Sequence, residues 1–493
     1  MKEVIDIRPL IAPGISILCA FLIFWKGENT FLRRFFSLSA AVTKWIIVLS
    51  MFPGSLRGII YTYELLPFAP GMSLNLRVDA LGMFFSVVSS TLWIITTVYA
   101  IGYMEGEHAR RRFFAFFALC VSTTVGIAYA GNLFTLFIFY EMLTISTYPL
   151  VIHEETPEAM KAGRKYLVYT LTGGAVILFA TVMTFYLAET TTLSQNGILS
   201  IKHGVHTLTI LFALFIVGFG VKAAIMPLHG WLPSAMVAPT PVSALLHAVA
   251  VVKAGVFGII RIIYNIFGVK LMGELGVGPI LGWVACITIV CASIMALLQD
   301  EFKKRLAYST ISQLSYIVLG ASILNVTGAI GAIVHIVNQA FMKIVMFFVA
   351  GSIAKKTGKN NISEMQGIGI KMPITMATFT VAAVGMMGLP PTAGFITKWY
   401  LLNGALEMSP AQIGFVVVLL LSSFLNASYF LPIVYRAYFV KPLDGDVTVN
   451  EAHWTMLIPC IICAFYIIGL GLFIELPLVP FQLAKTAAEQ FFK

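Results

Sequence analysis

FIVGFGVKAAIMPLHGWLPSAMVAPTPVSALLHAVAVVKAGVFGIIRIIY, residues 215–264, is the stretch that decides the fold of this chain. Two lysines, Lys222 and Lys253, lie inside runs that are otherwise apolar. Four prolines between them rule out one long helix: Pro227, Pro233, Pro239 and Pro241. Because a lysine at the centre of a bilayer costs roughly 3 kcal/mol, two of them beside a helix break indicate that charge moves here. The alternative is structural packing against a neighbour's carbonyls or a carboxylate.

The composition of the whole chain is that of a membrane protein. Of 493 residues, 59% are hydrophobic and 11% are charged, which is too apolar for a soluble protein. Since a spanning helix needs about 20 apolar residues, we expect an all-α polytopic protein of about fourteen transmembrane helices. The expected spans are 9–25, 35–52, 78–104, 112–130, 132–152, 165–188, 206–226, 240–264, 279–298, 305–323, 327–354, 373–407, 411–437 and 454–476.

The positive charges are divided unevenly between the two sets of loops. Seventeen lysines and arginines lie in the loops on one side and eight on the side of the termini. The positive-inside rule therefore predicts a multi-pass protein of the cell membrane with both termini outside. The net charge of +10 is typical of cytoplasmic loops and not of a nucleic-acid partner.

A weak internal repeat accompanies the helix breaks. Pro227-Leu-His-Gly230-Trp follows the span that carries Lys222, and Pro391-Thr-Ala-Gly394-Phe precedes Lys398. Pro390 directly precedes the second motif. Both motifs place a P-x-x-G-aromatic break inside a hydrophobic segment. Interrupted segments in matching positions of two halves are the usual sign of a transport site.

Four stretches carry a family resemblance: GVKAAIMPLHGWLPSAMVAPTPVSALLHA, QDEFKKRLAYSTISQLSYIVLG (299–320), HIVNQAFMKIVMFFVAG (335–351) and GLPPTAGFITKWY (388–400). Together they resemble the antiporter-like ion-translocating membrane subunits. This family includes the antiporter-like subunits of Mrp sodium/proton antiporters, the large pump subunits of complex I, and their counterparts in membrane-bound hydrogenases. The resemblance extends from about 79 to 438. It implies N-terminal spans in 1–111, two inverted five-helix repeats at 112–264 and 279–437, each with a broken helix, and a last span in 438–493.

Glu141 lies well inside the fifth expected span, in NLFTLFIFYEMLTISTYPLV. The resemblance implies that it pairs with Lys222. Burial favours the neutral form of each group, whereas proximity favours the charged forms, so opening and closing the pair would change how tightly Lys222 holds a proton. The alternative is a static ion pair that fixes helix packing.

The eighth span carries Lys253, which the resemblance makes a proton-relay candidate. His247 precedes Lys253 by six residues, or about 240° of helix, so the two share a face only if the helix is distorted. A histidine bonded to a backbone carbonyl is an equal alternative for His247.

His335, Gln339 and Lys343 have the spacing i, i+4, i+8 and should line one helix face. Many relatives have a second histidine where this chain has Gln339, and an amide passes a proton only by orienting water. The hydroxyls of Tyr308, Ser309, Thr310 and Ser312 could line a water chain or simply bond to helix carbonyls.

Three further positions are interpreted more simply. Lys398 lies where the family has a lysine or glutamate near the outer exit; its alternative is snorkelling to the interface. Asp79, at the start of the third span, is expected to anchor a helix end. Cys460 and Cys463 have CxxC spacing inside a span without a second pair, so we expect buried thiols and no metal.

The resulting functional hypothesis is a proton-translocating or sodium/proton-translocating subunit of a multisubunit membrane complex. Its partners would be other membrane subunits, homologous antiporter-like ones among them, and the lipid bilayer. No cofactor is expected, and the chain would be a non-catalytic subunit, with any redox chemistry in other subunits of an oxidoreductase complex. Two alternatives stay open: a quinone-binding electron-transfer subunit, and a stand-alone carrier of a small solute.

Overall fold

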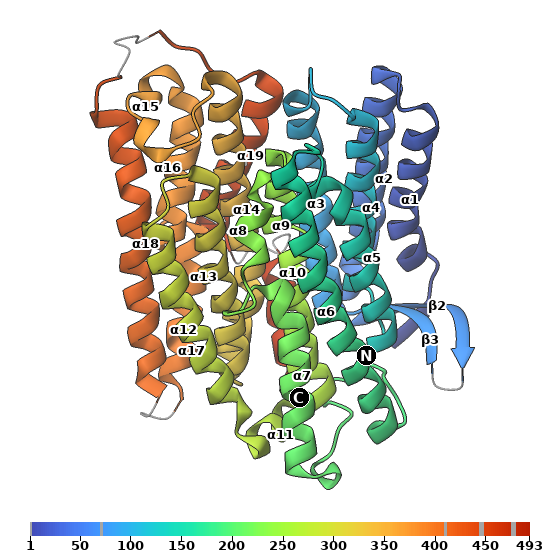
Figure 1. Ribbon diagram of the computed structural model, residues 1–493. Helices are drawn as coiled ribbons and strands as arrows, with labels where there is room; N and C mark the ends of the chain where they lie inside the picture. Colours follow the sequence, from blue (N-terminus) through green and yellow to red (C-terminus); the bar gives the residue numbers. More distant parts are fainter. Residues whose placement is uncertain (1, 70–71, 409–411, 443–447, 475–479) are drawn as a thin grey trace.

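The computed structural model describes residues 2–69, 72–408, 412–442, 448–474 and 480–493. Within these residues, twelve helices are long and apolar enough to cross a membrane. They stand roughly parallel in one bundle, with both termini toward the lower end of the view in Figure 1. The chain is therefore a polytopic helical membrane protein, as its composition predicts.

The helices follow one another closely along the chain. The N-terminal part contains α1 (Arg8–Lys26), α2 (Thr30–Leu56), α3 (Ala80–Tyr103), α4 (Arg110–Ala128), α5 (Leu133–Val151), α6 (Pro157–Ala188) and α7 (Val205–Ala223). The central part contains α8 (Trp231–Ser234), α9 (Thr240–Ala248), α10 (Val251–Arg261), α11 (Gly268–Leu275), α12 (Val277–Leu297), α13 (Phe302–Ser322) and α14 (Val326–Thr357). The C-terminal part contains α15 (Ile368–Lys371), α16 (Pro373–Met387), α17 (Ala393–Leu406), α18 (Ile413–Phe439), α19 (Trp454–Leu472) and α20 (Phe481–Phe491). Short helical turns are η1 (Ile201–His203), η2 (Ala235–Val237), η4 (Ile362–Glu364) and a π-helix, η3 (Ile262–Phe267).

Each of the fourteen expected spans coincides with a helix or a pair of helices. Two of them are not among the twelve apolar ones. The span expected at 305–323 is α13, which begins with two lysines and an arginine and is rich in hydroxyls, so its hydropathy is low. The span at 373–407 is divided into α16 and α17. Residues 411, 475 and 476 of the expected spans lie outside the described residues, and a count of fourteen crossings stays a prediction.

A small sheet is the one departure from the expected all-helical chain. β1 (Lys2–Ile5) pairs in parallel with β2 (Ile59–Ala69), which pairs antiparallel with β3 (Met72–Val78). The sequence of β2, IIYTYELLPFA, begins with β-branched and aromatic residues, which favour strands. The segment between α2 and α3 is thus extended, and it carries the chain to the start of α3.

Two elements form the centre of the bundle. Every residue in the most apolar window of Thr240–Leu275 and of α14 is buried, against 33% in α6 and in α18. The peripheral helices therefore face lipid or other subunits, while α9, α10 and α14 are enclosed by protein. Polar side chains on these central elements are shielded from hydrocarbon by the surrounding helices.

Polar residues define where several helices begin. The side chains of Asp79, Asn132, Thr156 and Asn325 accept hydrogen bonds from the first turns of α3, α5, α6 and α14. Each satisfies a backbone N–H that has no partner within its helix. The expectation that Asp79 anchors a helix end agrees with this geometry.

Candidate functional site

The first helix break lies between α7 and α8. α7 ends at Ala223, and Ala224 has a left-handed backbone with φ of 55°. Pro227 and Gly230 lie in the segment that follows, before Trp231 begins α8. The indole N–H of Trp231 donates to the carbonyl of Val221 at 2.7 Å, which satisfies one of the acceptors exposed by the end of α7.

Lys222 is the next-to-last residue of α7 and is wholly buried. Its ammonium donates to the carbonyl of Tyr140 at 2.6 Å and lies 3.5 Å from the centre of the Tyr140 ring. The lysine is therefore held by a backbone oxygen and an aromatic face, both from α5.

Glu141, the residue after Tyr140, does not form the expected direct ion pair. Among the ion pairs of the described residues, none joins Glu141 to Lys222, although the two interact electrostatically. The Glu141 carboxylate lies over Gly174 of α6, where an added Cβ would be 2.1 Å from Oε1. The pair is separated because the carboxylate is directed toward α6 while the lysine reaches the carbonyl of Tyr140.

The eighth expected span is interrupted between His247 and Lys253. α9 ends at Ala248 and α10 begins at Val251, with non-helical backbone at Ala250. The distortion that would let these two residues work together is thus present. Both interact electrostatically with Lys343.

Lys253 and His247 are wholly buried or nearly so. Neither the Lys253 ammonium nor either ring nitrogen of His247 has a hydrogen-bond partner among the described residues. The His247 ring lies 4.6 Å from that of Phe347. The carbonyl bond considered for His247 is therefore not observed.

α14 directs its polar face toward α13. The His335 ring lies 5.4 Å from that of Tyr316, and the Lys343 ammonium donates to the Leu306 carbonyl at 3.3 Å and to the Ser309 hydroxyl. Gln339, between them, is buried, and neither its amide nitrogen nor its oxygen has a partner in the described chain. Three adjacent positions on this face can therefore exchange protons or orient water.

The hydroxyls of α13 have mixed roles. Thr310 and Ser309 both donate to the Leu306 carbonyl, at 2.9 Å each, so they satisfy their own helix while Ser309 also accepts from Lys343. Ser312 is 3.0 Å from Ser293 of α12. The Tyr308 ring is 6.2 Å from that of His229, which lies in the first break.

The second break lies between α16 and α17. α16 ends at Met387, Gly388 is left-handed with φ of 82°, and Pro390 and Pro391 precede α17. Gly394, on the first turn of α17, packs so closely on the Gly385 carbonyl that a Cβ would lie 1.8 Å from the oxygen. The two half-helices therefore touch through backbone.

Lys398 of α17 reaches back to the end of α16. Its ammonium donates to the carbonyls of Met386 at 3.2 Å and Met387 at 2.6 Å, and to the Ser423 hydroxyl of α18 at 2.8 Å. The side chain is buried, so it does not snorkel to the interface. The negative end of the α16 dipole favours the cation at this place.

The site residues form two groups on helices that pack side by side. One group is Glu141 with Lys222; the other contains His247, Lys253, His335, Lys343 and Lys398, which are linked by electrostatic interactions. α7 and α10 join the groups, because Gly255 lies against Ala223, with a Cβ position 2.2 Å from the Ala223 nitrogen. A row of buried ionisable side chains thus crosses the bundle.

Several polar residues were not identified from the sequence. Lys44 of α2 is wholly buried, 4.5 Å from the Trp93 ring, with no hydrogen bond among the residues described. A single lysine within an apolar run is the same signal that identified Lys222, yet Lys44 contacts helices that carry no member of the row. Asn338 of α14 bridges to α17, through the Ala393 carbonyl at 2.7 Å.

Asp79 has a partner that the sequence did not indicate. Besides accepting from the Gly82 N–H, its carboxylate forms two hydrogen bonds with the buried Arg261 of α10, at 2.5 and 2.7 Å. This bidentate ion pair ties the start of α3 to the end of α10. Cys460 and Cys463 are buried free thiols in α19.

The comparison with protein families is decisive. The model described as "NADH:quinone oxidoreductase/Mrp antiporter, TM" matches residues 130–425, and that of the N-terminus of chain 5 of complex I matches residues 70–114. The chain belongs to the NADH:quinone oxidoreductase/Mrp antiporter family.

Relatives within this family come from two kinds of complex. NADH-quinone oxidoreductase subunit N of Desulforudis audaxviator is 33% identical over 438 residues, which is 85% of this chain and 86% of the relative. Na(+)/H(+) antiporter subunit A1 of Staphylococcus haemolyticus is 28% identical over 472 residues, 89% of this chain but 57% of the relative's length.

Two solved structures share the fold of this family member. A chain of the Mrp complex from a Dietzia species has a TM-score of 0.88 at 20% identity and covers 99% of this chain and 97% of its own. A chain of the membrane-bound sulfane sulfur reductase, an archaeal respiratory membrane complex, has a TM-score of 0.88 at 23% identity and covers 99% and 98%.

Proposed function

We propose that the chain translocates protons, or exchanges sodium for protons, as one subunit of a multisubunit membrane complex. The observation that carries this proposal is the row of four buried lysines, Lys222, Lys253, Lys343 and Lys398, none of which is in an ion pair among the described residues. The kinship with Na(+)/H(+) antiporter and NADH-quinone oxidoreductase subunits supports it.

The physical reasoning starts from the expense of burial. An isolated buried charge is strongly unfavourable unless it is paired or loses its charge. Lysines held by carbonyls, hydroxyls or an aromatic face can accept and release a proton without leaving a carboxylate unpaired. The histidines and Gln339 between them have polar atoms that water can bridge, since a buried polar group needs a partner.

The two breaks would give this path its two half-channels. In our proposal, 112–264 and 279–437 are inverted repeats, 1–111 supplies the N-terminal spans, and 438–493 supplies the last one. The end of α7 next to Lys222 and the end of α16 next to Lys398 are the matching features that support the assignment. Half-helix ends beside a transported charge are typical of transporters.

The partners in this proposal are other membrane subunits, including homologous antiporter-like ones, and the lipid bilayer. The parent assembly would be an Mrp-type antiporter or a redox-driven complex whose other subunits carry the electron-transfer chemistry. Both termini would face the outside of the cell membrane, as the distribution of positive charge favours.

The test compares buried lysines on and off the row. Lys222→Met removes the charge but keeps the length of the side chain, and Lys44→Met does the same at a buried site away from the row. Ion movement is measured in vesicles that contain the assembled complex, under an imposed sodium or pH gradient, and complex yield is measured in parallel. We expect Lys222→Met to assemble and lose ion movement, and Lys44→Met to retain it.

The double variant Glu141→Gln with Lys222→Met separates a proton carrier from a structural pair. For a structural pair, removing one buried partner costs about 3–5 kcal/mol, and removing both restores assembly and activity. For a carrier, the double variant assembles but stays inactive, because no titratable group is left to take the proton. Ion movement in the double variant or in Lys222→Met would refute the proposed role.

A further inference from the structure

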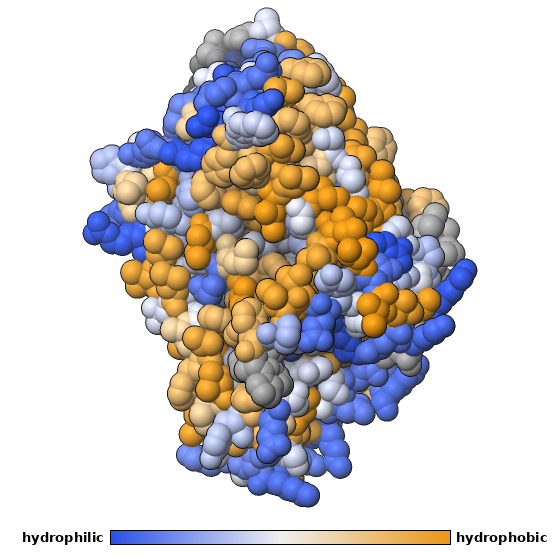
Figure 2. Space-filling model, turned by 90° about the vertical axis from the view of Figure 1, so that its right-hand side faces the viewer, coloured by the Kyte–Doolittle hydropathy of each residue, from blue (hydrophilic) through white to orange (hydrophobic). Residues whose placement is uncertain are grey.

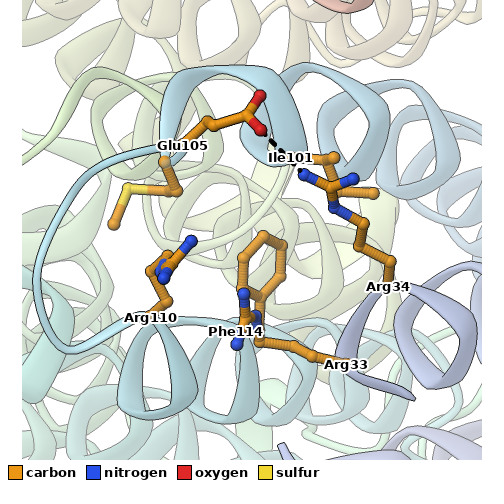
Figure 3. A pocket seen from close by; sticks show the side chains of 7 residues that line it. Arg33, Arg34, Ile101, Glu105, Arg110 and Phe114 are labelled. Carbon is orange, nitrogen blue, oxygen red and sulfur yellow. Dashed lines mark hydrogen bonds and ion pairs between the residues drawn. The ribbon is translucent and has the colours of Figure 1, made fainter. Parts of the chain in front are cut away.

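A small hollow at the upper end of the bundle lies apart from the row of lysines. It has an empty volume of about 210 Å³, and it lies where α2 approaches the turn between α3 and α4. Figure 3 shows the side chains around it, and three of the seven are arginines. The lining residues are Arg33, Arg34, Ile101, Met104, Glu105, Arg110 and Phe114.

Positive charge exceeds negative charge in this hollow. Arg34 forms an ion pair with Glu105 at 3.3 Å, the dashed contact in Figure 3. Arg33 and Arg110 are in no ion pair among the described residues. Two uncompensated guanidinium groups therefore meet in one hollow, and an anion between them would relieve their repulsion.

Arg33 is the built part of the hollow. It is only 4% exposed, its Nη1 donates to the Gly27 carbonyl at 2.7 Å, and its guanidinium lies 5.9 Å from the Phe114 ring. Its Nε is buried and has no partner in the described chain. A guanidinium fixed in this way keeps unused donors in a set direction, which suits the fork geometry of phosphate recognition.

The surface beside the hollow is apolar. Trp25 at the end of α1 and Phe31 and Phe35 at the start of α2 are 66%, 73% and 56% exposed. Figure 2 shows this side of the molecule, with an apolar band between hydrophilic upper and lower regions. Exposed aromatic residues at helix ends mark the level of lipid headgroups, so the hollow lies at the boundary between headgroups and acyl chains.

We infer that this hollow binds the phosphate of an anionic phospholipid. The phosphodiester is held by Arg33 and Arg110, and the acyl chains lie along the exposed aromatic flank of α1 and α2. Charge complementarity selects a phosphate, and the adjoining apolar flank selects a lipid over a soluble anion. The neighbouring Arg111 is excluded from the site because it already pairs with Glu28 at 2.9 Å.

The test uses the purified, delipidated complex and native mass spectrometry. Dioleoylphosphatidylglycerol is titrated against wild type, Arg110→Gln, and the double variant Arg33→Gln with Arg110→Gln. Arg111→Gln is the matched control, since it removes the same charge one residue away. We expect affinity to fall about tenfold in Arg110→Gln, by the loss of one charge-assisted contact, and further in the double variant. Arg111→Gln should change it by less than about twofold.

Other probes identify the source of the phosphate. Dioleoylphosphatidylcholine should bind more weakly than phosphatidylglycerol because its net charge is zero, and inorganic phosphate should not displace the lipid. Equal losses in Arg110→Gln and Arg111→Gln would mean general electrostatic attraction and would overturn the site. Displacement by inorganic phosphate, equal binding of phosphatidylcholine, or no binding to wild type would overturn it as well. Arg110→Gln alone suffices if the double variant does not assemble, because no structural contact depends on Arg110 among the described residues.

Discussion

Buried charge in this protein is carried by single lysines and not by ion pairs. Lys222 binds a carbonyl and an aromatic face, Lys343 a carbonyl and a hydroxyl, and Lys253 no group of the described chain. Such environments differ in how well they support an ammonium group, so a proton has unequal preferences along the row. The order of these side chains, more than any one of them, would set the direction of movement.

Gln339 tests whether water completes the path at one residue. Gln339→His should keep substantial ion movement, because an imidazole retains polar atoms at the same place between His335 and Lys343. Gln339→Leu should reduce it severalfold, since an apolar side chain removes the partners of a bridging water. The measurement is ion movement per assembled complex. Full activity in Gln339→Leu would place this face of α14 off the path.

His153 predicts a pH dependence of stability. It lies after α5, its buried ring stacks on His108 at 4.8 Å, and Arg112 donates to its carbonyl at 2.9 Å while pairing with Glu155. Burial, with Arg112 and His108 nearby, lowers the pKa of His153 to about 4. Between about pH 6.5 and that value the unfolded chain binds a proton that the folded one does not, so stability is lost as pH falls.

The measurement is the melting temperature of the purified complex at pH 7.5 and pH 5. His153→Leu should show a smaller loss than wild type between these two pH values, by the contribution of about one proton. His206→Leu, at an exposed site, should behave as wild type does. An identical pH dependence in wild type and His153→Leu would contradict the prediction.

At the scale of elements, the half-helices depend on close backbone contact. Gly394→Ala would place a Cβ against the Gly385 carbonyl, and no flexible side chain is there to move aside. We expect a loss of about 2 kcal/mol in stability, or displacement of α17 with reduced ion movement. Gly469→Ala, on α19 with no atom within 4 Å of its Cβ position, should be neutral or stabilising by up to about 1 kcal/mol. Thermal stability of both variants is compared with wild type, and equal behaviour would contradict the steric argument.

The elements also show what a sequence can indicate. The helices were predictable because each is a long apolar run, and both breaks were predictable because proline cannot continue a helix. The interruption at Val249 and Ala250 was not, since neither residue disfavours a helix by its type and the distortion arises from packing. The direction of the Glu141 carboxylate was hidden for the same reason: neighbouring helices decide where a side chain points.

For the molecule as a whole, the topology can be tested by labelling. Cysteines introduced at Lys304 and Lys356 should react with an impermeant reagent only from the cytoplasmic side, and one at Lys202 only from outside. The physical reason is the uneven distribution of positive loops. Reaction of Lys202 and Lys304 variants from the same side would rule out the fourteen-span arrangement.

The three contacts of Lys398 have a consequence that follows from valence. An ammonium group has three N–H donors, and here all three are engaged, by two carbonyls of α16 and one hydroxyl of α18. A neutral amine has only two donors for the same three acceptors. Departure of the proton and release of one acceptor are therefore a single event, and the acceptor released belongs either to a half-helix end or to its neighbour. At this residue the movement of a proton is also the unfastening of a helix.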